Sequence, residues 1–161
     1  MLHRRTGVSV VRTARDPSSQ AGDNLQRALG ALLGRALKED VRRELLRAAV
    51  ERRTVTYGYL MARFHLSRGR ELIGVIGEID RDEARSNAPG FAALVVRKDT
   101  GYPGGGFFCW EGLPSELRRP DAQASNARLS DAEKRYVKGL QEEIWGFYGP
   151  GAAAQEGLPE S

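Results

Sequence analysis

The first segment with side chains suited to binding an anion is the basic segment Ser67–Glu71, which is expected at the start of a helix. The guanidinium groups of Arg68 and Arg70 could fork onto phosphates or onto the edges of guanine bases. The exposed N–H groups at a helix start also favour a phosphate. The alternative is an ordinary helical hairpin with solvated arginines. The candidate DNA contacts in this segment are Ser67, Arg68, Gly69 and Arg70.

The second chemical segment is the glycine-rich loop at residues 97–106. Its cationic side chains, its hydroxyl group and its backbone N–H groups could hold phosphate, while its tyrosine could stack on an unpaired base. It lacks the glycine–lysine–hydroxyl order of a nucleotide-binding phosphate loop. A plain hairpin loop explains the glycines almost as well. The candidate contacts here are Arg97, Lys98, Thr100, Gly101 and Tyr102.

Residues that could support catalysis are few. The single cysteine, Cys109, has no histidine near it in sequence, so a packed thiol is the better interpretation. The acidic run at residues 78–83 has no partner carboxylates on a strand, which favours a solvated helix end with salt pairs over a metal site. Only His3 and His65 could add imidazole ligands. We therefore expect no catalytic residue, no metal and no cofactor.

Composition and charge bound the class of protein. A chain of 161 residues fits one domain with tails, and no window approaches the roughly 20 apolar residues of a membrane span. One cysteine fits a reduced, cytoplasmic location. Residues 1–70 carry 15 Arg and Lys against six Asp and Glu, whereas residues 71–161 carry 10 against 15. This asymmetry predicts an electropositive face that collects phosphates, unless the arginine excess only reflects a GC-rich genome.

The first half of the chain reads as helices after a flexible arm at residues 1–22. Asp23 is a suitable N-cap, and apolar residues then recur at helical spacing to about Arg53. Gly30 and Gly34 weaken the middle of this stretch. One bent helix and two separate helices therefore both remain open.

A helix-turn-helix is expected next. Thr56 can cap a short helix over Tyr57–Phe64, and Ser67 can cap a longer one to about Arg85. Gly74 and Gly77 on the longer helix would permit close packing against the shorter one.

A β-hairpin is expected after these helices. The apolar run Phe91–Arg97 predicts a strand, and Gly106–Trp110 is its expected partner. Ser130 then caps a last helix that ends near residue 148, and residues 149–161 read as a disordered tail. The expected fold is therefore α+β and mostly α. It is a winged helix-turn-helix at residues 23–148 with a β-hairpin wing and extra N- and C-terminal helices.

A distributed pattern of residues adds a family resemblance. It comprises Val55-Thr-Tyr-Gly-Tyr-Leu-Met-Ala62, Gly74, Leu94-Val-Val96, Gly101 and Gly104-Gly-Gly106. The pattern covers residues 54–108 and resembles the DNA-binding domain of alkylguanine-DNA alkyltransferases and alkyltransferase-like proteins. The resemblance implies a winged helix that grips the minor groove and flips a damaged base. It also implies that Tyr57 helps to turn a phosphate. The glycine-rich stretch is similar to an uncharacterised group of bacterial proteins as well, which implies no activity.

Two positions depart from the family pattern. Ala92 occupies the place of the nucleophilic cysteine, and alkyl transfer needs a thiolate there. Glu71 occupies the place of the base-extruding arginine, and Arg70 points about 100° away around the helix. The resemblance therefore carries over the scaffold, Tyr57 and the wing, but neither the repair reaction nor base flipping.

The sequence thus predicts a non-enzymatic DNA-binding protein. Its function would be to sense lesions or DNA structure, or to serve as the DNA-reading subunit of a larger system. The alternative is a protein–protein interaction module on the same scaffold, which docks a partner or forms a homodimer through its N- or C-terminal helices.

Overall fold

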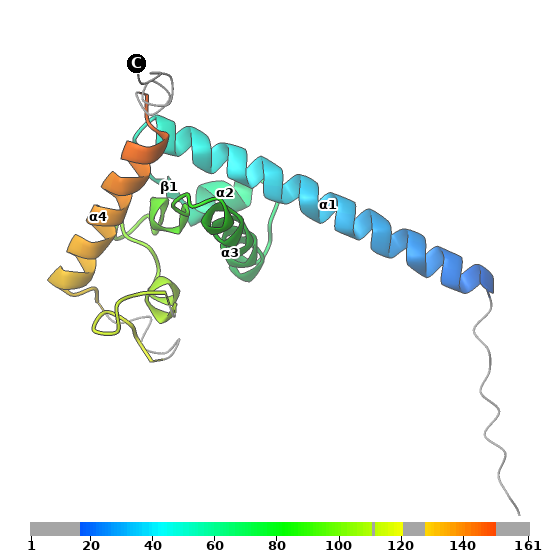
Figure 1. Ribbon diagram of the computed structural model, residues 1–161. Helices are drawn as coiled ribbons and strands as arrows, with labels where there is room; N and C mark the ends of the chain where they lie inside the picture. Colours follow the sequence, from blue (N-terminus) through cyan, green and yellow to red (C-terminus); the bar gives the residue numbers. More distant parts are fainter. Residues whose placement is uncertain (1–16, 111, 121–127, 151–161) are drawn as a thin grey trace, which may run out of the picture. The chain divides into compact units, whose positions relative to one another are not determined.

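The computed structural model describes residues 17–110, 112–120 and 128–150. The chain divides into two compact units, Met1–Arg35 and Ala36–Ser161. In chain order the elements are α1 (Pro17–Val50), β1 (Val55–Thr56), α2 (Tyr57–Arg63), α3 (Gly69–Arg85), the 3₁₀ helix η1 (Ala92–Leu94), β2 (Val95–Val96), the 3₁₀ helix η2 (Gly105–Cys109) and α4 (Asp131–Tyr148) (Figure 1). The expected class, α+β and mostly α, is confirmed for the described residues.

Helix α1 begins earlier than its sequence signals predict. Its first residue is Pro17, six positions before the expected cap at Asp23, so residues 17–22 of the predicted arm are helical. Proline suits the first helical position because its missing N–H would have no partner there in any case. The helix continues through Gly30 and Gly34 without a break. Residues 1–16 of the predicted arm lie outside the described residues.

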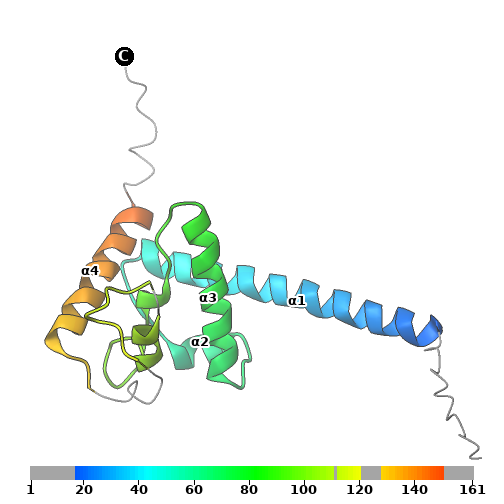
Figure 2. The same ribbon diagram turned by 60° about the horizontal axis from the view of Figure 1, so that its bottom comes forward.

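The second unit is built on a core that α1, α2, α3 and α4 share. Leu72, Ile76 and Ile79 recur at helical spacing on α3, so they enter the core from one face. The segment with η1 and β2 lies between α3 and α4 (Figure 2). The central buried side chains are Val41, Leu45, Leu60, Leu72, Ile76, Ile79, Phe91, Leu94, Val95 and Ile144.

The sheet of the described residues is parallel, and the predicted β-hairpin is wrong. Strand β2 pairs with β1, with Val55 opposite Val95 and Thr56 opposite Val96. The expected partner segment forms the 3₁₀ helix η2 instead, and its Phe108 is buried against Val137 of α4. Because both faces of β2 are buried, its apolar pattern gives no indication of which strand lies beside it.

Two helices and a short turn form where they were predicted, with one difference at a cap. Thr56 caps α2 as expected, because its hydroxyl oxygen accepts the N–H of Tyr59 at 3.1 Å. The turn after α2 places His65 in the left-handed region, with φ of 54°. The N-cap residue of α3 is Arg68, and its side chain forms no capping hydrogen bond. The prediction that Ser67 caps this helix is therefore wrong.

Helix α4 begins as its sequence predicts. The Ser130 hydroxyl accepts the N–H of Glu133 at 3.1 Å, and the Glu133 carboxylate accepts the N–H of Ser130 at 2.9 Å. This capping box satisfies N–H groups that the first turn leaves unpaired. Gly149 ends the helix. Residues 151–161 of the predicted tail lie outside the described residues.

The acidic run on α3 forms salt pairs as the sequence predicts, through Asp82 with Lys38 and Arg85, but it is not a solvated helix end. The Asp80 carboxylate accepts the backbone N–H groups of Phe91 at 2.7 Å and Ala92 at 3.2 Å. Glu83 is buried, where it accepts hydrogen bonds from Arg42 of α1 and, at 2.8 Å, from the Tyr148 hydroxyl of α4. These two carboxylates therefore join α3 to the elements around it.

A substitution at Gly90 tests the hydrogen bonds that Asp80 accepts from Phe91 and Ala92. A Cβ atom at Gly90 would lie 2.6 and 2.7 Å from the two Asp80 oxygens, and Asp80 could move aside only by giving up its bonds to Phe91 and Ala92. We expect Gly90→Ala to lower the free energy of unfolding by about 1–3 kcal/mol in urea melts. Gly74→Ala is the control, because its Cβ would meet open space in mid-helix. It should raise stability by up to about 1 kcal/mol. Equal effects of the two changes would contradict this account.

Candidate nucleic-acid interface

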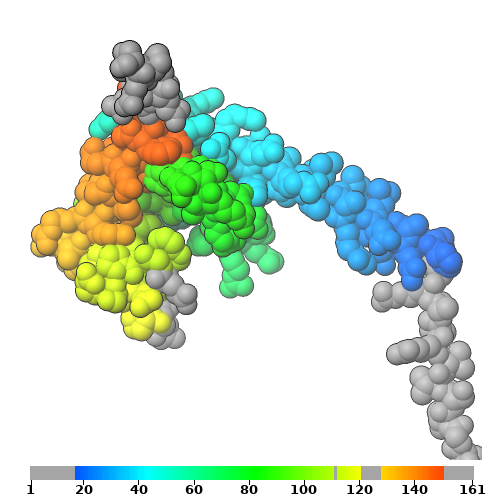
Figure 3. Space-filling model, viewed as in Figure 1, coloured from blue at the N-terminus to red at the C-terminus, as the bar shows by residue number. Residues whose placement is uncertain are grey.

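Helix α3 presents an outward face that carries two glycines. Arg70, Ile73, Gly74 and Gly77 follow one another at helical spacing on this face. The structure corrects the interpretation that the two glycines pack against α2. A Cβ at Gly74 would contact nothing within 4 Å, and one at Gly77 would meet only the Arg81 side chain, at 3.7 Å. Ile73 is 60% exposed although it is a large apolar residue. Figure 3 shows α3, in green, at the surface of the second unit.

The predicted contacts at the start of α3 are largely exposed to solvent. Ser67, Arg68 and Arg70 are exposed, and Gly69 is half-buried with open space beside its Cα atom. Neither Arg68 nor Arg70 forms an ion pair with a described residue. Their guanidinium groups are therefore available to a ligand. The exposed Glu71 in the first turn is the one acidic side chain of the segment.

The loop after β2 is closed by its own hydrogen bonds. The N–H of Arg97 donates to the Tyr102 carbonyl at 2.9 Å, and the N–H of Gly101 donates to the Arg97 carbonyl at 2.8 Å. Gly101 has φ of 71°, a value that strains other residues. The Thr100 hydroxyl also bonds the backbone of Tyr102. Loop residues 97–102 thus form a defined turn at the surface.

The two cations of this loop differ in their availability. The Arg97 guanidinium binds both carboxylate oxygens of Asp99, at 3.0 and 2.7 Å, and these hydrogen bonds hold the pKa of Asp99 below its ordinary value. Lys98 is exposed and forms no ion pair with a described residue. Lys98 is therefore the loop cation that is free to contact a phosphate.

Tyr57 links the start of α2 to the loop. Its phenol oxygen accepts the N–H of Gly104 at 3.3 Å, and burial raises the pKa of the hydroxyl group. The hydroxyl hydrogen has no acceptor among the described residues. Tyr57 therefore positions the loop and still has a hydrogen to donate.

Tyr102 is not a free stacking platform. Its half-buried ring packs beside Phe108 and Val137, and the ammonium groups of Lys134 and Lys138 lie 5.8 and 5.4 Å from the ring centre. The ring therefore joins the loop to α4. These contacts place two α4 lysines beside the loop. Sequence reasoning missed them because nothing in the local pattern of α4 relates it to residue 102.

The residues that could support catalysis lie apart from one another. Cys109 is half-buried, and its thiol lies 3.8 Å from the Gly105 carbonyl. Asp82 binds Lys38 at 2.7 Å. Within residues 17–110, 112–120 and 128–150, no three His, Cys, Asp or Glu side chains gather where they could hold a metal ion. Of the described helices, none is long and apolar enough to cross a membrane.

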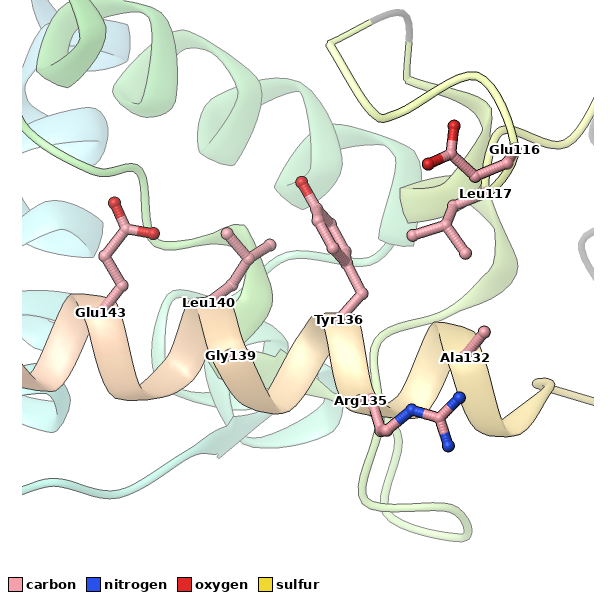
Figure 4. A pocket seen from close by; sticks show the side chains of 8 residues that line it. All are labelled: Glu116, Leu117, Ala132, Arg135, Tyr136, Gly139, Leu140 and Glu143. Atoms are coloured by element: carbon pink, nitrogen blue, oxygen red, sulfur yellow. The ribbon is translucent and has the colours of Figure 1, made fainter.

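An open groove of about 570 Å³ lies along α4, and none of the predicted site residues lines it. In Figure 4, Tyr136 and Leu140 point from the helix toward the side where Leu117 lies. The remaining lining residues are Glu116, Ala132, Arg135, Gly139 and Glu143. The groove mixes acidic, basic and apolar groups, so its lining indicates no particular ligand.

Comparison with known proteins assigns no family. No family model, no curated protein and no solved structure matches the chain. The resemblance to alkyltransferase DNA-binding domains therefore rests on the sequence pattern alone.

Tyr57→Phe tests the link between α2 and the loop. The change removes the acceptor of the Gly104 N–H and keeps the ring, so we expect a loss of about 1 kcal/mol in unfolding free energy. The amide hydrogen of Gly104 should exchange faster in NMR experiments. Tyr136→Phe is the matched control, because no described residue bonds its hydroxyl group. Unchanged protection of Gly104 would show that the hydroxyl does not hold the loop.

Proposed function

We propose that this protein binds DNA without catalysing a reaction, through a helix-turn-helix formed by α2 and α3. The observation that carries the proposal is the outward face of α3. Arg68 just before the helix and Arg70 on this face form no ion pair with a described residue, and Gly74 on the same face opens onto solvent. Arginine at the start of such a helix can reach phosphates and base edges.

The two glycines support a close approach to the DNA. Side chains normally separate a helix backbone from its ligand, and glycine removes that separation. Gly74 and Gly77 would let the α3 backbone come near the groove wall, while Ile73 beside them supplies apolar contact of the kind that suits a thymine methyl group or a base step. An exposed isoleucine has no such use on a merely solvated helix.

The loop at residues 97–104 takes the part of the wing in this proposal. It is not a β-hairpin, but β2 and the Tyr57 bond fix it relative to α2. Lys98 would contact the phosphate backbone from this loop, which positions the protein without reading sequence. The proposed arrangement is thus a winged helix-turn-helix whose wing is a loop.

Arg68→Gln and Arg70→Gln test the DNA contact of α3. We expect each change to weaken binding to a duplex about three- to tenfold and to reduce the salt dependence of the affinity by about one released counterion. Fluorescence anisotropy at several salt concentrations measures both. Arg85→Gln at the other end of α3 is the control, since Arg85 already binds Asp82 at 2.8 Å. Absent or salt-independent binding of duplex, mismatched and single-stranded DNA would refute the proposal.

Gly74→Leu is a second, steric test of the same face. The added side chain meets open space in the free protein, so thermal melts should show an intact fold. It would hold α3 away from the groove, so DNA affinity should fall although no charge is lost. Unchanged affinity would contradict the close approach of α3.

A specific observation in the first unit favours self-association as a second candidate function. Leu25, Leu29, Leu32 and Leu33 are 62%, 50%, 55% and 70% exposed on the N-terminal half of α1. Their spacing forms one apolar stripe without charged residues, so two copies could face one another without like-charge contacts. A solvated helix with three glycines is marginal by itself, and burying leucines in a dimer would stabilise it.

Leu29→Asp together with Leu32→Asp tests self-association. In a dimer the four buried carboxylates would be costly, so the mass in solution should fall from twice the chain mass to that of one chain. Light scattering after size-exclusion chromatography measures this mass. Arg27→Gln on the same helix should leave the dimer intact. A wild-type protein that is monomeric would exclude the second candidate.

A further inference from the structure

Three arginines surround one buried carboxylate beside the helix-turn-helix. Glu44 of α1 is 4% exposed. Its oxygens lie 3.4 Å from Nε of Arg63, 3.7 Å from Nη2 of Arg53 and 4.0 Å from Nη1 of Arg47. We name these four residues the Glu44 cluster. Glu44 and Arg47 lie on α1, Arg53 lies in the segment that follows it, and Arg63 is the last residue of α2.

The Glu44 cluster contains more positive charge than its carboxylate can neutralise. One guanidinium suffices for one buried carboxylate, and Arg53 has a second partner in Glu51. Three positive charges therefore stand against two negative ones.

Most guanidinium N–H groups of the Glu44 cluster form no hydrogen bond with a described residue. The one hydrogen bond that Glu44 accepts among the described residues comes from the Tyr59 hydroxyl, at 3.1 Å. Arg47 and Arg63 lie near the carboxylate as ion pairs and form no hydrogen bond with a described residue. Their side chains are 58% and 49% exposed. An anion that approaches from solvent would meet guanidinium N–H groups, with the carboxylate behind them.

We propose that the Glu44 cluster binds a phosphate of the DNA backbone, with Arg47 and Arg63 as its donors and Glu44 as the residue that positions them. The inference rests on the proposed DNA-binding function and extends it to a second contact site. Arg63 immediately precedes the turn into α3, and the first helix of a helix-turn-helix crosses the sugar–phosphate backbone. Guanidinium groups held by a fixed carboxylate lose less freedom when a phosphate binds.

The main experiment compares Arg47→Gln, Arg63→Gln and the double variant with Arg85→Gln. Arg53 remains in every variant as an ion-pair partner of Glu44, and circular dichroism checks the fold. We expect each change in the Glu44 cluster to weaken duplex binding about three- to tenfold and to lower the salt slope by about one. The loss should be equal for duplexes of different sequence, since a phosphate contact carries no sequence information. Arg85→Gln should leave affinity and salt slope unchanged.

Two outcomes separate this inference from the proposed function. If the wild type binds DNA and the variants bind equally well with the same salt slope, the Glu44 site is overturned while the α3 contact stands. If the wild type binds no DNA, the proposed function fails. Titration with inorganic phosphate then tests whether the Glu44 cluster binds phosphate at all. NMR signals of the Arg47 and Arg63 side-chain N–H groups should then shift with phosphate but not with equal ionic strength of chloride. No such shift would overturn the phosphate site as well.

Discussion

Two carboxylates on α3 fix the arrangement on which the second unit depends. Asp80 accepts the backbone N–H groups of Phe91 and Ala92, and Glu83 accepts bonds from Arg42 of α1 and Tyr148 of α4. Carboxylates taken from water are costly unless their oxygens are bonded. Burial raises the pKa of Asp80 although its two N–H bonds oppose that rise. Burial and the bond to Glu83 likewise raise the pKa of the Tyr148 hydroxyl.

The orientation of α3 follows from these bonds. With its C-terminal half tied to α1, α4 and the turn before η1, the helix must direct Leu72 and Ile79 into the core. The 100° rotation per residue then places Arg70, Ile73 and Gly74 on the outside. The surface proposed to contact DNA is thus a consequence of the buried polar contacts at the other end of the same helix. This explains how an exposed face without packing partners can still have a defined position.

The sequence predicts those features that local signals determine. The caps at Thr56 and Ser130 follow from side-chain groups within three residues of the N–H they bind, and both are confirmed. The pairing of Val55 with Val95 joins residues 40 positions apart, and a buried strand has the same pattern beside any neighbour. The acidic run on α3 looks solvated because its partners lie on distant elements. The same limit applies to the site, because the sequence places Arg70 at the start of α3 but does not show that Gly74 and Gly77 lie away from α2.

Two of the buried glutamates, Glu83 and Glu44, show how one residue type serves two purposes. Glu83 has both oxygens in close hydrogen bonds, so its partners are committed to the fold. Glu44 is as deeply buried, but its arginines stand at 3.4–4.0 Å, and two of them, Arg47 and Arg63, form no hydrogen bond with a described residue. A carboxylate that is satisfied at close range stabilises an interface, whereas one that holds several cations at longer range concentrates positive charge at the surface. Because Glu44 and Arg42 are only two positions apart on α1, a single helix supplies both arrangements. It anchors α3 on one side and presents arginines beside the end of α2 on the other.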